Sequence, residues 1–191
     1  MKKKYYLKVS EINSLISASP NPRDRIVIKL LSRTGITRSE LQRLNISDID
    51  FEKKQLWVSN EKTNKLRLVP VDDDTLRDIR YLFGSKTNGR LISSQNRSTD
   101  GISLKEINMI TKRCGILAAV KTPDPDSKYI SPQLLRNSFI FNAYRAGVPV
   151  QHIQQIVGLS SVKSILDTIE KPVTSEVQDS YEKWTKVIES V

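Results

Sequence analysis

The side chains with the widest chemical repertoire are scarce in this sequence, which holds one histidine, His152, and one cysteine, Cys114. One residue of each type is too few for a histidine- or thiolate-based metal centre or for a disulfide framework. The sequence also lacks a glycine-rich phosphate loop, an HExxH pair and a Ser-His-Asp set. His152 lies between apolar positions of an expected helix, so we interpret it as a surface or half-buried residue beside the core.

Cations are the abundant functional groups. The 191 residues include 31 Lys and Arg against 21 Asp and Glu, a net charge of +10. This excess favours a polyanionic partner, most commonly nucleic acid, over a basic surface that only maintains solubility. No apolar run approaches the roughly 18 residues of a membrane span, and the basic start of the chain lacks the apolar stretch of a secretory signal. We therefore expect a cytoplasmic, nucleoid-associated protein with no membrane partner.

The elements that must position these cations are mostly helices. The pattern predicts a helix over 9–17 with Ser10 as its cap, and a helix over 22–33 that ends at Gly35. Thr37 and Glu40 form a capping box that starts the next helix. The period then changes to that of strands, and residues 55–71 read as a β-hairpin with a polar turn at 60–64.

The rest of the sequence again predicts helices. Asp72–Asp74 precede a helix with an apolar stripe, residues 84–101 hold at most a short strand at Leu91 and Ile92, and Ser103 with Glu106 forms another capping box. Further helices are expected over 131–147, 149–158, 161–169 and 174–188. The predicted fold is one mainly α domain over 1–191 with a small antiparallel β-sheet (α+β).

Two stretches of this pattern resemble the signatures of the tyrosine recombinase catalytic domain, of the phage integrase and Xer-like family. Thr34–Leu41 with Ser47–Asp50 is similar to the first signature, and the hairpin end Lys62–Pro70 follows it. Ser131–Phe139 is similar to the second signature, normally SPHxLRHxF, and Ala146–Val148 and Ile153–Ser161 follow at the expected interval. The resemblance covers about residues 8–185, and it implies the tyrosine recombinase catalytic-domain fold.

This family cuts DNA with a tyrosine that attacks the scissile phosphate and stays attached through a 3′-phosphotyrosine bond. The resemblance implies that two arginines, a hairpin lysine and two His-type groups surround that phosphate. Such phosphoryl transfer depends mainly on positioning and on cations. The family chemistry needs no metal or organic cofactor, so none is expected, and no small-molecule substrate is expected.

Matching residue by residue assigns four phosphate contacts to this chain. Arg136 keeps the second-signature arginine near a helix N-terminus, which can share an anion with it. Lys62 matches the hairpin lysine, with a solvated turn lysine as the alternative. Thr37 holds the place of the first arginine, and Arg38 is the next residue, rotated by about 100° on a helix. Gln133 stands at the first histidine, and it can hydrogen-bond a phosphate but not donate a proton as histidinium does.

The remaining family positions are degenerate. The second histidine of the signature is Asn137, and the His or Trp expected after Gly158 is Leu159. The nucleophile positions hold Thr168 and Ile169, and a threonine hydroxyl is a poor nucleophile without a dedicated base. The nearest tyrosine, Tyr181, lies on the apolar face of the last expected helix, where a core or docking role is favoured over a displaced nucleophile.

The sequence thus predicts a DNA-binding protein of this family that is catalytically inactive and that acts in or regulates DNA integration or recombination. The alternative is a divergent recombinase that cuts through Tyr181 or a tyrosine supplied in trans. The resemblance further implies that the N-terminal core-binding domain is absent, and that the helix at about 174–190 docks on another copy or on an active recombinase. Less favoured are a helix-turn-helix over 139–158 and a protein-interaction module without a DNA role.

Overall fold

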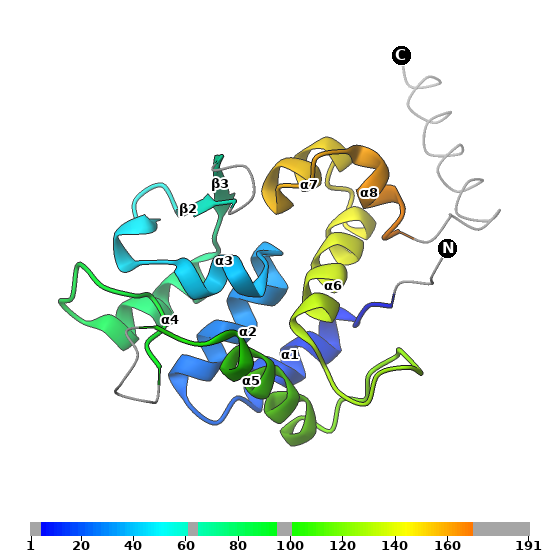
Figure 1. Cartoon of the computed structure of the whole chain (residues 1–191), viewed down its shortest axis with the longest axis horizontal. Coiled ribbons are helices and arrows are strands. Elements are labelled where there is room, and N and C mark those ends of the chain that lie inside the picture. The colour runs from blue at the N-terminus through cyan, green and yellow to red at the C-terminus, as the bar shows by residue number, and fades with distance from the viewer. Residues whose placement is uncertain (1–4, 61–64, 95–100, 170–191) are drawn as a thin grey trace, which may run out of the picture.

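The computed structural model describes residues 5–60, 65–94 and 101–169, in which a small sheet lies at one edge of a group of helices (Figure 1). The predicted class, mainly α with a small antiparallel sheet, is confirmed. The described helices and strands are α1 (Val9–Ser17), α2 (Pro22–Thr34), α3 (Arg38–Arg43), a 3₁₀ turn (Ile46–Asp48), β1 (Ile49–Asp50), β2 (Gln55–Ser59), β3 (Leu66–Pro70), α4 (Asp73–Phe83), α5 (Leu104–Leu117), α6 (Pro132–Arg145), α7 (Val150–Val157) and α8 (Val162–Leu166).

Helix α2 is the central element, because α1, α4, α5 and α6 all pack against it. Asn21 caps its first turn by accepting a hydrogen bond from the Asp24 amide at 2.9 Å. Gly35 ends the helix at a φ of 65°, and a Cβ there would lie 2.5 Å from Phe139 and 2.9 Å from Val157. Only glycine therefore lets the end of α2 lie this close to α6 and α7.

The sheet has the order β1-β2-β3 with antiparallel pairing throughout. Trp57 pairs with Leu68 on the exposed face, while Leu56, Val58 and Val69 are buried against the core. This alternation is the period-2 signal that predicts the hairpin from sequence. Strand β1 was not predicted, because two residues are too few to show alternation.

Three local predictions need correction. Helix α1 is capped by Lys8, whose amide donates to the Glu11 carboxylate at 2.7 Å, and Ser10 lies inside the helix. Leu91 and Ile92 are buried but form no strand, the nearby pairing being an isolated bridge between Asn45 and Arg90.

The third correction concerns the box at Ser103, which is only half formed. Ser103 accepts a hydrogen bond from the Glu106 amide at 3.1 Å, as predicted. The Glu106 carboxylate, however, binds the Arg23 guanidinium and the Ser94 hydroxyl. A charged donor from α2 thus takes the carboxylate that the box would have used.

The buried side chains form two clusters. The larger one fills the space around α2 between the sheet, α1, α4, α5 and the start of α6. The smaller one joins α6, α7 and α8 through Ile140, Ile153, Val157 and Ile165. Helices α7 and α8 therefore form a lobe of their own over the end of α6 (Figure 1). The expected helix at 174–190 lies outside the described residues, and none of the described helices is long and apolar enough to cross a membrane.

Candidate nucleic-acid interface

A pocket of about 690 Å³ opens between the start of α3, the middle of α5 and the N-terminus of α6. Four cations line it, together with one carboxylate, Asp126. The four are Arg38, Lys112, Lys128 and Arg136. Gln133 and Thr37 complete the wall on the α6 and α3 sides. Of the four predicted phosphate contacts, the structure thus brings together Arg136, Arg38 and Gln133, and Lys62 lies outside the described residues.

Arg136 is almost fully buried at 6% exposure. Its guanidinium donates to the Gly35 carbonyl and, at 2.8 Å, to the Val157 carbonyl. Burial lowers the pKa of Arg136 to about 10, while the nearby Glu40 carboxylate opposes that shift. The side chain stays charged at neutral pH, and its five N–H donors exceed the two bonds that hold it. Arg136 is therefore fixed by the backbone and keeps capacity for an anion.

A second arginine, the partly buried Arg67 from β3, lies beside this site. It makes two hydrogen bonds to Glu40, at 2.6 and 3.0 Å, and donates to the Ile156 carbonyl at 2.8 Å. Burial raises the pKa of Glu40, but the hydrogen bonds from Arg67 and from the Thr37 amide outweigh it, so the net pKa is lowered. Glu40 thus binds the Thr37 amide at the start of α3 and the Arg67 guanidinium. Arg67 in turn binds the last turn of α7.

The other three cations of the pocket differ from Arg67, because no described carboxylate forms an ion pair with Arg38, Lys112 or Lys128. Arg38 is exposed and donates to the Asn108 side chain at 3.2 Å. The Lys112 ammonium lies 3.9 Å from the centroid of the Tyr129 ring, and a hydrogen bond from it lowers the pKa of the Tyr129 phenol. Within the described part of the chain, the pocket therefore holds a net positive charge.

The two amides at the family's histidine positions bind each other. Gln133 donates from Nε2 to Oδ1 of Asn137 at 2.8 Å, one helical turn apart on α6. Gln133 is exposed at the pocket, so its carbonyl can still accept and its second amide hydrogen can still donate. Thr37 serves as the predicted cap, accepting from the Glu40 amide at 3.2 Å.

The degenerate positions near the end of the described chain pack inward. Leu159 and Ile169 pack against the smaller cluster of α6, α7 and α8. Thr168 is buried, and its hydroxyl donates to the Ser164 carbonyl at 3.0 Å within the helical turn. Tyr181 lies outside the described residues. His152 is exposed on α7, in agreement with its interpretation as a surface residue.

Sequence reasoning missed Lys112, Lys128 and Tyr129 as members of the site. Lys128 and Tyr129 directly precede the Ser131 cap of α6, and this proximity to a predicted helix N-terminus was the available signal. The sequence around Lys112 contains no such signal, because α5 reaches the pocket only through the tertiary fold. The hairpin pattern assigns no role to Arg67, although its alternation with the exposed Leu66 and Leu68 marks it as inward-facing.

This arrangement of a basic pocket on α3, α5 and α6 beside a small sheet defines an integrase-type catalytic domain. The model of the Phage integrase family matches residues 5–168, and the chain belongs to this family. The helix pair α6 and α7, considered above as a helix-turn-helix, falls within that match.

Relatives of this chain within the family include Xer recombinases. The chain is 30% identical over 188 residues to tyrosine recombinase XerA of Pyrococcus horikoshii, covering 97% of this chain and 62% of the relative. A crystal structure of XerA recombinase superimposes with a TM-score of 0.78 at 25% identity, covering 96% of this chain and 66% of that one. XerH recombinase bound to its difH substrate shares the fold, with a TM-score of 0.73 at 17% identity, covering 96% of this chain and 55% of that one. The chain thus spans less than two thirds of the XerA relative's length.

Proposed function

We propose that this chain binds double-stranded DNA through the pocket of α3, α5 and α6, without cutting it, and that it acts in or regulates DNA recombination. The observation that carries the proposal is the group of three cations, Arg38, Lys112 and Lys128, that no described carboxylate neutralises. Buried or paired cations serve the fold, whereas unpaired cations gathered in one pocket suit the phosphates of a polyanion.

The absence of cutting is supported by the residues at the nucleophile position. The Thr168 hydroxyl is buried and is bound to a backbone carbonyl, and Ile169 has no hydroxyl. At the two histidine positions, the amides of Gln133 and Asn137 cannot supply a proton to a leaving oxygen. The described groups at these positions can hold a phosphate, but they supply neither a nucleophile nor a proton donor for exchanging its bonds.

Binding to DNA is also supported by the relatives, since XerH is bound to a DNA substrate in its structure. The partner expected for the segment at 174–190, a second copy or an active recombinase, remains a prediction. So does the nucleoid location, which would follow from binding to genomic DNA.

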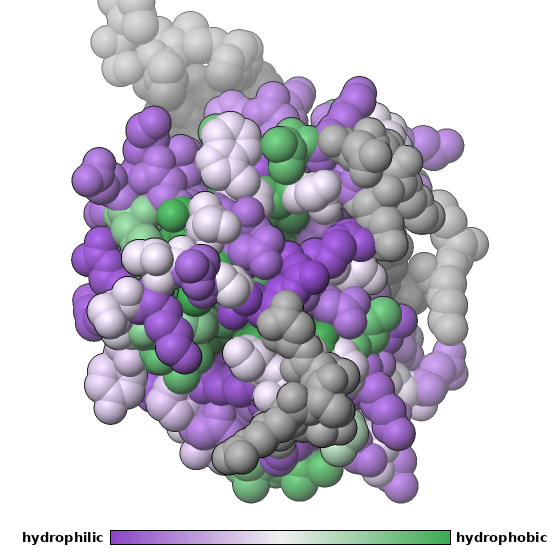
Figure 2. Space-filling view, turned by 60° about the vertical axis from the view of Figure 1, so that its left-hand side comes forward, coloured by the Kyte–Doolittle hydropathy of each residue, from purple (hydrophilic) through white to green (hydrophobic). Residues whose placement is uncertain are grey.

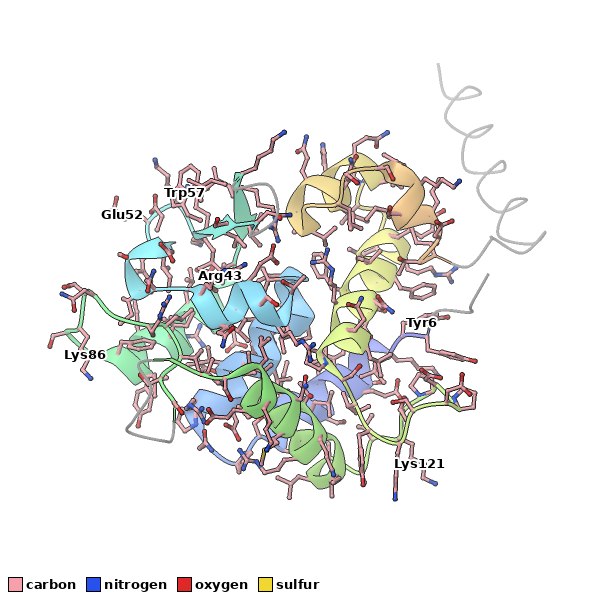
Figure 3. The ribbon with its side chains drawn as sticks, viewed as in Figure 1. Tyr6, Arg43, Glu52, Trp57, Lys86 and Lys121 are labelled. Atoms are coloured by element: carbon pink, nitrogen blue, oxygen red, sulfur yellow. The ribbon has the colours of Figure 1, made fainter. Side chains whose placement is uncertain are left out.

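The first experiment compares Arg38→Ala with Lys86→Ala in duplex binding at several salt concentrations. Both variants lose one positive charge, but Lys86 lies in the exposed turn after α4, far from the pocket (Figure 3). We expect Arg38→Ala to reduce the slope of log K against log salt by about 0.9, the value for one lost phosphate contact. Lys86→Ala should leave the slope unchanged, and equal slopes for the two variants would contradict the proposal. Arg136 is a poorer first target, because its loss also removes the bonds that tie α6 to the Gly35 carbonyl at the end of α2 and to the Val157 carbonyl at the end of α7.

A second experiment tests the alternative of a divergent enzyme. Genomic DNA fragments are captured with the purified protein and washed in parallel under native conditions and in SDS. We expect DNA only after the native wash. DNA that survives SDS would indicate a covalent link and a functional nucleophile, and its loss in Tyr181→Phe would assign that role to Tyr181.

A further inference from the structure

A second groove, of about 510 Å³, adjoins the cation pocket. It lies between the C-terminal half of α5 and the loop that connects α5 to α6, from which Lys121 extends toward solvent (Figure 3). The pocket and the groove share five lining residues, Lys112, Ser127, Lys128, Tyr129 and Ile130. They are therefore two parts of one continuous depression that meet at Tyr129.

The character of the wall changes on either side of Tyr129. Beyond it the lining is largely apolar, with Gly115, Ile116, Ala119, Val120 and Pro125, and it also includes Lys121, Thr122 and Asp124. A Cβ at Gly115 would lie 2.7 Å from Ile130, so glycine allows the connecting loop to approach α5. Ile116 is 60% exposed and lines this groove. The groove thus offers an apolar surface directly beside unpaired cations.

Tyr129 is positioned at this junction by two lysines. The ammonium groups of Lys112 and Lys128 lie 3.9 and 5.7 Å from its ring centroid. Cation–π attraction and the hydrogen bond from Lys112 restrain the ring. The side chain nevertheless remains 36% exposed. A restrained, exposed aromatic ring is a suitable platform for stacking a planar group.

We propose that the groove receives an unpaired nucleobase of a DNA strand whose neighbouring phosphate lies in the cation pocket. This inference rests on the proposed function. A nucleotide has an anionic end and a flat, largely apolar end, in the same order as the pocket and the groove along the depression. Bases of an intact duplex are stacked and out of reach, whereas a bulged base is exposed at little cost. The preferred partner is therefore duplex DNA that carries an unpaired base.

The test compares a fluorescently labelled duplex with the same duplex carrying one bulged 2-aminopurine. We expect the bulged DNA to bind about tenfold more tightly, the order of effect of one base–aromatic stack. Quenching of the 2-aminopurine on binding should report the stacked base. Tyr129→Leu should abolish both the quenching and the preference, so that this variant binds bulged and intact duplex with equal affinity, and Tyr129→Phe should keep both.

A matched pair of variants tests the apolar wall. Ile116→Gln and Leu117→Gln change neighbouring residues of α5 that are 60% and 55% exposed, but only Ile116 lines the groove. We expect Ile116→Gln to weaken binding of bulged DNA severalfold and Leu117→Gln to leave it unchanged.

The possible failures are distinguishable. If no DNA binds, the proposed function is wrong and this inference falls with it. If duplex and bulged DNA bind equally, or if Ile116→Gln and Leu117→Gln behave alike, the base site is wrong while the proposed function stands. If either of these results refutes the base site, an acidic protein segment with an apolar side chain would be the occupant to test next.

Discussion

Cations of α2 form ion pairs with carboxylates of α4, whereas three cations of the pocket form none with a described carboxylate. On the side where α2 meets α4, Lys29 is 3% exposed and its ammonium lies 2.6 Å from Asp78 and 2.8 Å from Asp74. Arg33 binds Asp72 and Asp74 at 2.7 and 2.8 Å. Around the pocket, Arg38, Lys112 and Lys128 form no ion pair with a described carboxylate.

The cations behind the net charge of +10 therefore serve different purposes in these two regions. The face that carries the sheet and α4 is mostly hydrophilic, with its hydrophobic residues in separate spots (Figure 2). Its acidic helix start neutralises the cations of α2, so their charge contributes to stability. Among the described residues the pocket holds four cations and one carboxylate, Asp126, so net positive charge remains available to a partner.

The largest effect is expected from removing a buried ion pair between α2 and α4. Asp78→Ala leaves buried Lys29 with one carboxylate fewer and removes the partner of Arg25, whose Nε lies 3.1 Å from Asp78. We expect a loss of about 3 kcal/mol in the free energy of unfolding, measured with urea, and unchanged DNA affinity in the folded protein. Asp73→Ala is the control, since its pair with Lys54 is exposed on both sides and should be worth about 0.5 kcal/mol. Equal losses of stability in the two variants would contradict the distinction between buried and exposed ion pairs.

A smaller effect is expected at Arg67, the paired cation beside the pocket. Gly158 has a φ of 68°, and a Cβ there would lie 2.9 Å from the Arg67 guanidinium. Gly147 has a φ of 85° with no atom within 4 Å of such a Cβ. We expect Gly147→Ala to cost about 1 kcal/mol from backbone strain alone, and Gly158→Ala about 2 kcal/mol because Arg67 must also move. Equal costs in thermal unfolding would show that Arg67 yields freely.

The unpaired side should respond in binding rather than in stability. Lys112→Gln removes a pocket cation, while Lys105→Gln removes an exposed cation from the same helix outside the pocket. We expect Lys112→Gln to weaken duplex binding about fivefold and to lower the salt slope by about 0.9. Lys105→Gln should change neither quantity, and both variants should unfold as the parent chain does. A stability loss in Lys112→Gln would mean that its charge already serves the fold.

The smallest effect concerns the acid response of the paired side. Hydrogen bonds from Lys29 and Arg33 lower the pKa of Asp74 to about 2, against burial, which raises it slightly. A lowered folded-state pKa stabilises the protein above the unfolded value near 3.8, and that stabilisation is lost as the pH falls toward about 2. Asp74→Asn should therefore flatten the fall in stability between about pH 4 and pH 2. An unchanged acid profile would contradict the assignment.

The predictable parts of this molecule are those encoded locally. The cap at Thr37, the glycine that ends α2 and the alternation of the hairpin each depend on neighbours in sequence, and the structure shows all three. Arg136 was predicted at the site through the second signature. Lys112 could not be predicted, because α5 and the connecting loop meet only after α2 has organised the core, whereas Tyr129 lies shortly before a predicted helix start. The buried contact between Arg67 and Glu40 depends in the same way on how the sheet docks.

The carbonyls at the end of α7 have a consequence for motion. Arg67 and Arg136 bind the Ile156 and Val157 carbonyls, while the side chains of α7 pack mainly in the smaller cluster. Helices α7 and α8 are thus joined to the main body by these polar ties and by the packing of Ile156 against the larger cluster, and a unit with so small a core of its own opens at a lower free energy than the main core. Backbone amides of α7 and α8 should accordingly exchange with solvent deuterium as one group, ahead of those in α2.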